Sequence, residues 1–192
     1  DLETGDLIGA FPTKGHTEGQ PIVASHEGQN LLFGVAGKDG VFAIDPISMT
    51  QVWHQVHGHV DGSVRVADGR VFVGSAVEKG DKKSAKPTLT AYRFTDGEVL
   101  WQNSISASSW TAPIVTTNVV YVALGEIYDE TSFGQLVGYD SASGKTVLEI
   151  SVGAPMSSPP IQVGNRIYVS DRKEQINCFD LETEICLWTS PT

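Results

Sequence analysis

A unit of four short apolar segments occurs four times in this sequence, and this repeat constrains the fold more than any other feature. The third segment of each unit ends at positions 45, 93, 140 and 180. The order of the segments stays the same while the interval between units varies, which indicates loop insertions on a fixed scaffold. Each segment is rich in Val, Ile, Tyr and Phe and is bounded by Gly, Asn, Asp or Ser, as strands are.

The repeat predicts an all-β fold, because no segment shows a sustained helical period. Four-stranded units of roughly 40–50 residues cannot bury both of their faces alone, and stacking them around an axis gives a β-propeller. We therefore predict one propeller region over residues 1–192, with four visible blades of four-stranded antiparallel sheet. The blades are expected at about 20–57, 62–105, 111–152 and 157–190.

A turn joins the third and fourth strands of each unit. In the Asp-Ser-Ala-Ser-Gly turn at 140–144, the side chain of Asp140 can bond the turn backbone and Gly144 can adopt a positive φ. Residues 1–5 (Asp-Leu-Glu-Thr-Gly) have the same pattern, so residues 6–11 are expected to be the outer strand of a blade whose first three strands are absent. One position of the fourth strand is occupied in the four units by Trp53, Trp101, Leu148 and Trp188. A large residue that recurs once per unit predicts packing between blades.

These features together resemble the PQQ-like (pyrroloquinoline-quinone-like) repeat family. They are the strand entry with Pro and Ile or Val, the Gly-x-Val-Tyr-Val type of strand, the strand that ends in Asp, and the Gly and Trp that follow; the resemblance runs from Asp1 to Trp188. The family includes quinoprotein dehydrogenases, which hold the quinone and calcium in the central funnel. It also includes non-catalytic members such as the lipoprotein of the bacterial outer-membrane β-barrel assembly machinery, and this chain resembles that type more closely.

The resemblance implies seven or eight blades in the closed propeller and a periplasmic or extracellular location. Four blades alone would leave two apolar blade faces open to solvent, which is an aggregation liability. We therefore expect further blades, or a second chain, to close the propeller.

The resemblance also implies the equipment that a dehydrogenase would carry: adjacent bridged cysteines, carboxylate and Asn ligands for calcium, and an Asp base. This sequence has two cysteines, Cys178 and Cys186, and they are not adjacent. Glu126, Asp129 and Glu130 lie in one loop, but without the glycine spacing of a calcium loop. We expect a solvated acidic loop and predict no cofactor, with the quinone and Ca²⁺ as the alternative.

The two cysteines lie on either side of the last turn. If Asp180 pairs with Glu184, Cys178 lies opposite Cys186, which is close enough for a disulfide. The competing interpretation, which we favour, is two small buried thiols.

Three histidines, His54, His57 and His59, end a fourth strand and begin its exit turn. On a strand, His57 and His59 point to one side and His54 to the other. Two imidazoles on one side could share zinc or copper, although a third ligand would have to come from elsewhere. We expect a polar loop here and no metal site.

Charge and hydropathy limit the classes of partner. The net charge is −10, with 13 basic residues against 23 acidic ones and no basic run beyond Lys82–Lys83. Binding nucleic acid requires a basic surface, so a nucleic-acid partner is excluded. The sequence has no run of about eighteen apolar residues, so we expect no membrane-spanning helix.

In a propeller, the connections from the fourth strand to the next blade and from the second strand to the third share one face. Here these connections carry the insertions, at 77–87 and 126–133, which is typical of a working surface. Trp110 lies on this face, either as an exposed binding anchor or packed against the neighbouring loop. The predicted binding residues are Trp110, His57, His59, Glu126, Tyr128, Asp129 and Arg172.

The complete repeat and the absence of a catalytic motif favour a non-catalytic scaffold that binds a protein or another ligand through this face. The alternatives are a fragment of a quinone-dependent dehydrogenase and a carbohydrate- or ligand-sensing propeller domain. A protein partner is expected under the first hypothesis.

Overall fold

The computed structural model of the protein describes residues 1, 3–78, 80, 86–129, 131–156 and 158–191. Glu130 of the acidic loop and the Lys82–Lys83 run lie outside these residues. The described part of the chain forms sixteen β-strands. It contains no helix that is long and apolar enough to cross a bilayer.

The strands form four antiparallel sheets, and in each sheet the strands pair in chain order. The first blade contains β1 (Ile22–His26), β2 (Gln29–Val35), β3 (Val41–Ile44) and β4 (Gln51–Gln55). The second contains β5 (Arg65–Ala67), β6 (Arg70–Gly74), β7 (Thr88–Arg93) and β8 (Val99–Ser104). The third contains β9 (Ile114–Thr116), β10 (Val119–Leu124), β11 (Gly134–Asp140) and β12 (Thr146–Val152). The fourth contains β13 (Ile161–Val163), β14 (Arg166–Ser170), β15 (Ile176–Asp180) and β16 (Cys186–Thr189).

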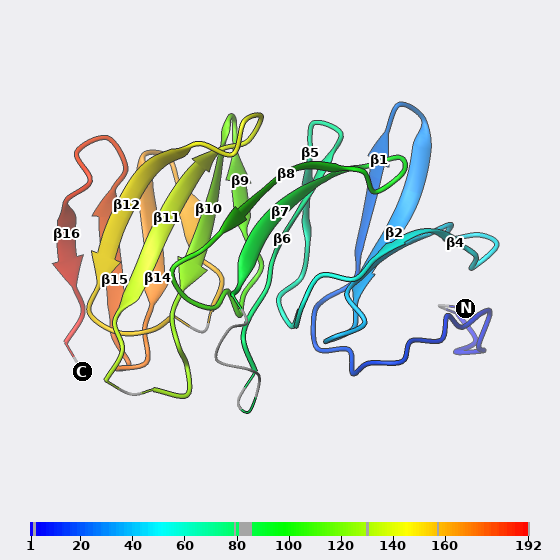
Figure 1. Ribbon diagram of the computed structural model, residues 1–192, viewed down its shortest axis with the longest axis horizontal. Coiled ribbons are helices and arrows are strands. Elements are labelled where there is room, and N and C mark those ends of the chain that lie inside the picture. The colour runs from blue at the N-terminus through cyan, green and yellow to red at the C-terminus, as the bar shows by residue number, and fades with distance from the viewer. Residues whose placement is uncertain (2, 79, 81–85, 130, 157, 192) are drawn as a thin grey trace.

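The sheets stand side by side as an unclosed row of propeller blades, with the N-terminal blade at one end and the C-terminal blade at the other (Figure 1). Each blade has a β-bulge at the same place between its third and fourth strands, after Ala43, Ala91, Gly138 and Cys178. A bulge bends its strand and increases the local twist. Its recurrence shows that the repeat in the sequence is a repeat in the backbone.

The turn after the third strand is built as the sequence predicts. The carboxylate of Asp140 accepts hydrogen bonds from the amide and hydroxyl of Ser143, and the amide of Gly144 donates to the Asp140 carbonyl oxygen. Hydrogen bonds from the Ser143 hydroxyl and amide lower the pKa of Asp140. Asp1 makes the same kind of bonds: its carboxylate accepts from the Glu3 amide, and its carbonyl oxygen accepts from the amide of Gly5, which has a φ of 76°.

The core lies between neighbouring blades, where the apolar face of one sheet packs against the next. At the first interface Phe33 and Trp53 of blade 1 pack with Tyr92 and Phe94 of blade 2. At the second interface Trp101 of blade 2 stacks on Tyr139 of blade 3 and donates to the Ser141 carbonyl oxygen. The predicted role of Trp53 and Trp101 in blade-to-blade packing is therefore confirmed.

The outer strand expected at 6–11 is not present. A strand needs a ladder partner, and no other described residue pairs with this segment. It lies along blade 1 instead, where Phe11 packs edge-on against Phe42 at a ring distance of 5.4 Å. Leu7 and Ile8 remain exposed.

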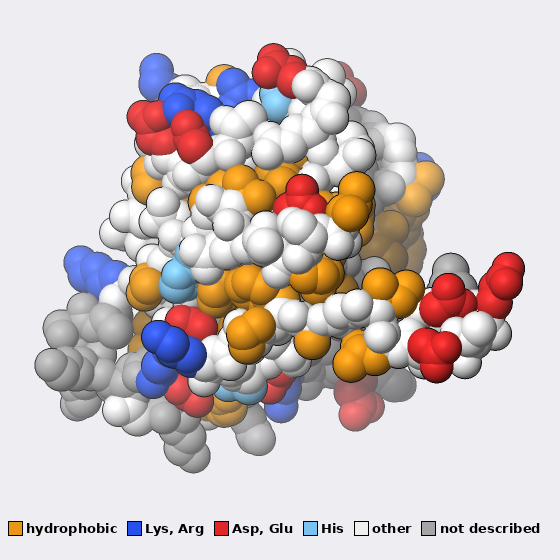
Figure 2. Space-filling view, turned by 90° about the vertical axis from the view of Figure 1, so that its right-hand side faces the viewer, with side chains coloured by type: hydrophobic (Ala, Val, Ile, Leu, Met, Phe, Trp, Pro, Cys, Tyr) orange, Lys and Arg blue, Asp and Glu red, His pale blue; other side chains and the backbone are white. Residues whose placement is uncertain are grey.

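Both ends of the row expose apolar side chains. Figure 2 shows the flank of the N-terminal blade, where bands of hydrophobic side chains reach the surface; Val23 and Val52 are exposed on this blade. On the C-terminal blade Leu187 and Trp188 are exposed. The described residues thus leave open the two flanks that a further blade would cover.

Candidate functional site

The connections predicted to share one face do so, and backbone hydrogen bonds join them from blade to blade. Val60 and Gly37 exchange two such bonds, and the Ala76 amide donates to the His59 carbonyl oxygen at 2.8 Å. Between blades 2 and 3, the Ser109 amide donates to the Ser75 carbonyl oxygen. We call this surface the loop face; it consists of the described residues of 13–19, 36–39, 57–62, 77–87, 106–110, 126–133, 154–156 and 171–174.

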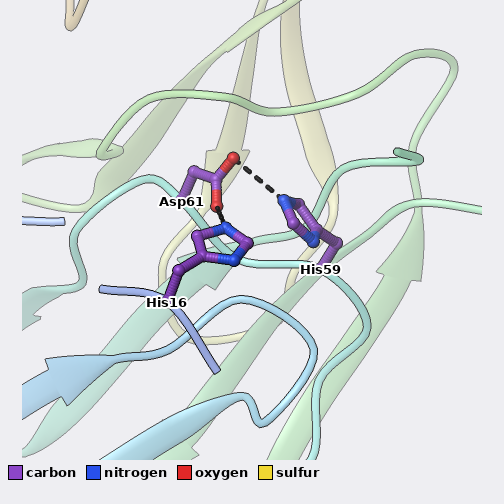
Figure 3. A group of neighbouring side chains, drawn as sticks. All are labelled: His16, His59 and Asp61. Carbon is purple, nitrogen blue, oxygen red and sulfur yellow. Dashed lines mark hydrogen bonds and ion pairs between the residues drawn. The ribbon is translucent and has the colours of Figure 1, made fainter. Parts of the chain in front are cut away.

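The loop face holds a compact group of two imidazoles and one carboxylate, His16, His59 and Asp61 (Figure 3). The two oxygens of Asp61 point to different rings: Oδ1 lies 3.1 Å from Nε2 of His16, and Oδ2 lies 2.9 Å from Nε2 of His59. The carboxylate therefore bridges two histidines that are 43 positions apart in the chain.

A pocket of about 310 Å³ opens beside this group. Three carboxylates and two imidazoles contribute to its wall, and Trp110, Ile127 and Tyr128 form an apolar side. The lining residues are His16, Glu18, His59, Asp61, Glu78, Trp110, Ile127 and Tyr128. Parts of the chain that belong to three blades thus meet around one cavity whose polar wall favours a cation.

Glycines allow the loops to approach this closely. A Cβ on Gly37 would lie 2.9 Å from Cε1 of His16, so the imidazole rests on the bare backbone of that residue. A Cβ on Gly62 would lie 2.5 Å from the backbone carbon of Thr111 in the next connection. A side chain at either position would push the loops apart.

Trp110 packs against the neighbouring loop and is not an exposed anchor. Its indole Nε1 donates to the carbonyl oxygen of Gly125 at 3.1 Å, and its ring meets Tyr128 edge-on at 5.3 Å. The ring of His59 also packs edge-on against the indole, at a centroid distance of 6.1 Å. Trp110 is therefore a buried support that holds Tyr128, and Tyr128 is the exposed aromatic residue of the pair.

Glu126 fastens the acidic loop to the preceding connection. Its carboxylate accepts hydrogen bonds from the amide of Ser108 at 2.9 Å and from the Ser108 hydroxyl at 3.0 Å. Asp129 accepts bonds from the hydroxyl and amide of Thr131, and these bonds lower the pKa of Asp129. Both carboxylates thus accept hydrogen bonds from groups of the loop face itself.

His57 and His59 do not share a site. The side chain of His57 is buried, and its Nδ1 lies 2.6 Å from the hydroxyl of Tyr92. Burial lowers the pKa of His57 to about 4, so this imidazole is neutral at neutral pH. The two residues separate because the connection turns at Gly58, whose φ is 64°.

The structure thus brings together Trp110, His59, Glu126 and Tyr128 among the predicted residues, and it leaves the others apart. Asp129 lies exposed on the same loop, whereas Arg172 is exposed on the fourth blade, with its amide bonded to Pro155. Sequence analysis missed His16 and Asp61. The signal was a local repeat, His-Thr-Glu-Gly at 16–19 and His-Val-Asp-Gly at 59–62, in which each histidine lies six residues before the first residue of β1 or β5.

The register expected for the cysteines is wrong. The bulge after Cys178 shifts the pairing, so Cys178 lies opposite Trp188 and Cys186 lies opposite Phe179. Both thiols are free, with Cys178 buried and Cys186 exposed. The free-thiol interpretation holds, but only one of the two is a core residue.

The innermost strands β5, β9 and β13 line a second pocket, of about 620 Å³. Its described lining includes Arg65, Thr116 and Gln162 but no carboxylate. Calcium requires about six to eight oxygen ligands, usually with carboxylates among them. The described part of this wall therefore offers no carboxylate ligand to calcium.

Comparison with known proteins places these blades in a family. The model of the outer membrane protein assembly factor BamB family matches residues 37–126 and 122–192. BamB from Moraxella catarrhalis is similar in structure, with 18% sequence identity and a TM-score of 0.63; the match covers 83% of this chain and 45% of that chain. A search of curated proteins by sequence finds no match.

Two other solved structures share the fold. The quinohemoprotein alcohol dehydrogenase ADHIIG from Pseudomonas putida HK5 has 15% sequence identity and a TM-score of 0.75; the match covers 95% of this chain and 35% of that chain. The computationally designed Ika4 protein has 12% sequence identity and a TM-score of 0.66; the match covers 93% of this chain and 99% of that chain. The chain spans less than half the length of BamB and of the dehydrogenase. On the family match over most of its length, the chain belongs to the outer membrane protein assembly factor BamB family of PQQ-like repeat proteins.

Proposed function

We propose that this chain is part of a non-catalytic propeller scaffold that binds a protein partner through the loop face. The observation that carries the proposal is the placement of Tyr128, which is 57% exposed and is held from behind by the buried Trp110. Aromatic side chains held rigid on a surface are frequent hot spots of protein interfaces. Phe133, at the end of the same loop, is exposed as well.

The site chemistry supports binding rather than catalysis. The carboxylates of the acidic loop bond local amides and hydroxyls, and the pocket on the innermost strands presents no carboxylate among its described residues. Membership of a family described as outer membrane assembly factors supports a periplasmic location.

We propose further that blades outside this chain, or a second chain, close the propeller. Trp188 is 45% exposed, whereas Trp53, at the same position of blade 1, is 5% exposed beneath blade 2. Covering the C-terminal flank with a similar blade would bury Trp188 in the same way.

Site-specific photocrosslinking tests the scaffold proposal. A photoreactive phenylalanine analogue replaces Tyr128 in one variant and, as the control, Glu27 in another, at the exposed turn between β1 and β2 on the opposite edge. In a periplasmic extract, position 128 should give a discrete protein adduct and position 27 should not.

Competition makes the result specific. Excess wild-type protein should abolish the adduct, whereas a Tyr128→Ala/Phe133→Ala double variant should compete poorly. Equal adducts from both positions, or equal competition by both proteins, would contradict a binding role for this face. Quinone and Ca²⁺ added to the protein should leave dye-linked alcohol oxidation at the background rate.

A further inference from the structure

We propose that His16, His59 and Asp61 form a binding site for a divalent transition-metal ion of the zinc class. Nothing in the scaffold function requires this site, so the inference goes beyond it. Two imidazoles with one carboxylate is a ligand set that Zn²⁺ and its first-row neighbours accept.

The spacing of the ligand atoms suits such an ion. One nitrogen or oxygen from each of the three residues lies within 4.8 Å of the others, and the Asp61 oxygens lie 3.1 and 2.9 Å from the two Nε2 atoms. Ligands about 2.0–2.1 Å from a tetrahedral zinc ion lie roughly 3.3 Å from one another. An ion at this place would replace the two hydrogen bonds with three coordinate bonds.

The surroundings hold the ligands in place. The side chain of His59 is 3% exposed, and its Nδ1 has no hydrogen-bond partner within the described structure. The Glu78 carboxylate lies 3.8 Å from that nitrogen. Metal-bound histidines usually direct their second nitrogen to a carboxylate, which fixes the tautomer and the ring orientation. His16 is seated on the backbone of Gly37.

Three protein ligands leave one position of a tetrahedral ion open. The three ligand residues line the same pocket as Glu18 and Tyr128, so water or a partner side chain in that pocket could complete the coordination. The imidazole nitrogens favour zinc-class ions over Mg²⁺ and Ca²⁺, which prefer oxygen ligands.

The competing explanation is a hydrogen-bonded group that only fastens the 13–19 segment to the 57–62 connection. That explanation predicts the same coordinates but no response to zinc. Calorimetric titration of the whole chain with Zn²⁺ separates the two, and Co²⁺ added in place of zinc reports the geometry through its visible absorption.

Matched variants assign the ligands. His16→Gln removes an exposed ligand, and Asp61→Asn removes the bridging charge. His26→Gln, in β1 and outside the group, is the control. We expect one Zn²⁺ per chain in the wild type and in His26→Gln, each with a higher melting temperature when zinc is present. Affinity should fall at least about tenfold in His16→Gln and Asp61→Asn.

Three results would overturn the proposal: no zinc-dependent heat or shift in melting temperature in the wild type, unchanged affinity in both ligand variants, or Mg²⁺ binding as tight as zinc binding. Circular dichroism establishes that each variant is folded. If Asp61→Asn does not fold, His16→Gln decides the question, because its side chain is half exposed and contributes little to the core.

Discussion

The indole of Trp53 in blade 1 lies against Gly97 in blade 2, where an added Cβ would come within 2.8 Å of the ring. The indole Nε1 also donates to the carbonyl oxygen of Phe94 at 2.8 Å. Trp101 and Gly144 repeat the arrangement at the next interface, again at 2.8 Å. In both of these pairs the preceding blade contributes the Trp and the following blade contributes the glycine.

The 6–11 segment meets blade 1 with the same fit, but here the small residue and the large residue have exchanged places. Gly9 occupies the position that corresponds to Trp53, and Met49 occupies the position that corresponds to Gly97. A Cβ on Gly9 would lie 2.8 Å from Cγ of Met49. Large and small residues thus alternate across the interface, so the volume between blades stays filled.

Removing the indole at a covered interface should cost far more stability than removing it at an open one. Trp53→Ala should lower the free energy of unfolding by about 3–5 kcal/mol, because it leaves a cavity and an unpaired carbonyl oxygen. Trp188→Ala, on the exposed flank, should lower it by about 1 kcal/mol or less. Urea denaturation of this chain followed by circular dichroism measures both values.

Gly97→Ala serves as the partner variant at the covered interface. Its φ of 74° and the nearby Trp53 ring both oppose a side chain, so a clear loss of stability is expected. Equal losses for Trp53→Ala and Trp188→Ala would mean that Trp188 is covered in solution.

Acid should destabilise the protein through His57. Burial lowers the pKa of His57 to about 4 in the folded chain, whereas the unfolded chain binds the proton near pH 6.5. The unfolded state therefore holds more protons between these values, and stability falls as the pH is lowered from about 6.5 to 4, by about 3 kcal/mol from this residue. Urea denaturation at several pH values measures the slope.

A His57→Gln variant isolates that contribution. Glutamine can still bond the Tyr92 hydroxyl but does not titrate. We expect lower stability than wild type at pH 7 and a shallower decline between pH 6.5 and 4. A slope identical to that of the wild type would assign the acid sensitivity to other groups.

Glu126 should matter for loop structure more than its surface position suggests. Glu126→Ala leaves the amide of the buried Ser108 without its acceptor, which should cost about 1–3 kcal/mol. Glu126→Gln keeps one acceptor oxygen and should lose less. Asp129→Ala removes the same charge from the same loop and should cost less than about 1 kcal/mol.

The cysteines should differ in reactivity. In the folded protein, an alkylating reagent should modify Cys186 and spare Cys178, because only Cys186 is exposed. After unfolding, both should react without added reductant. Mass spectrometry counts the adducts, and an unfolded, unreduced chain that carries no adduct on either cysteine would contradict the free thiols.

Local sequence patterns were sufficient to predict the blades. Strand segments, the Asp140–Gly144 type of turn and the place of Trp53 and Trp101 follow from short patterns that repeat, so each copy supports the others. The 6–11 segment was misjudged because a strand is not a local property: it forms only where a partner strand offers its hydrogen bonds.

The candidate site was only partly predictable for a related reason. The repeat indicated which connections share a face, and it therefore placed His59 and Trp110 on the same surface. It did not show that His57 turns inward to Tyr92, or that Asp61 bridges His16 and His59. Those outcomes depend on distances of a few ångströms between loops of different blades. The sequence by itself determined the blade, because a blade is made of neighbours in the chain. Only the tertiary structure decided the site, because His16 and His59, which are 43 positions apart in the chain, meet only through the packing of loops that follow one another around the blades.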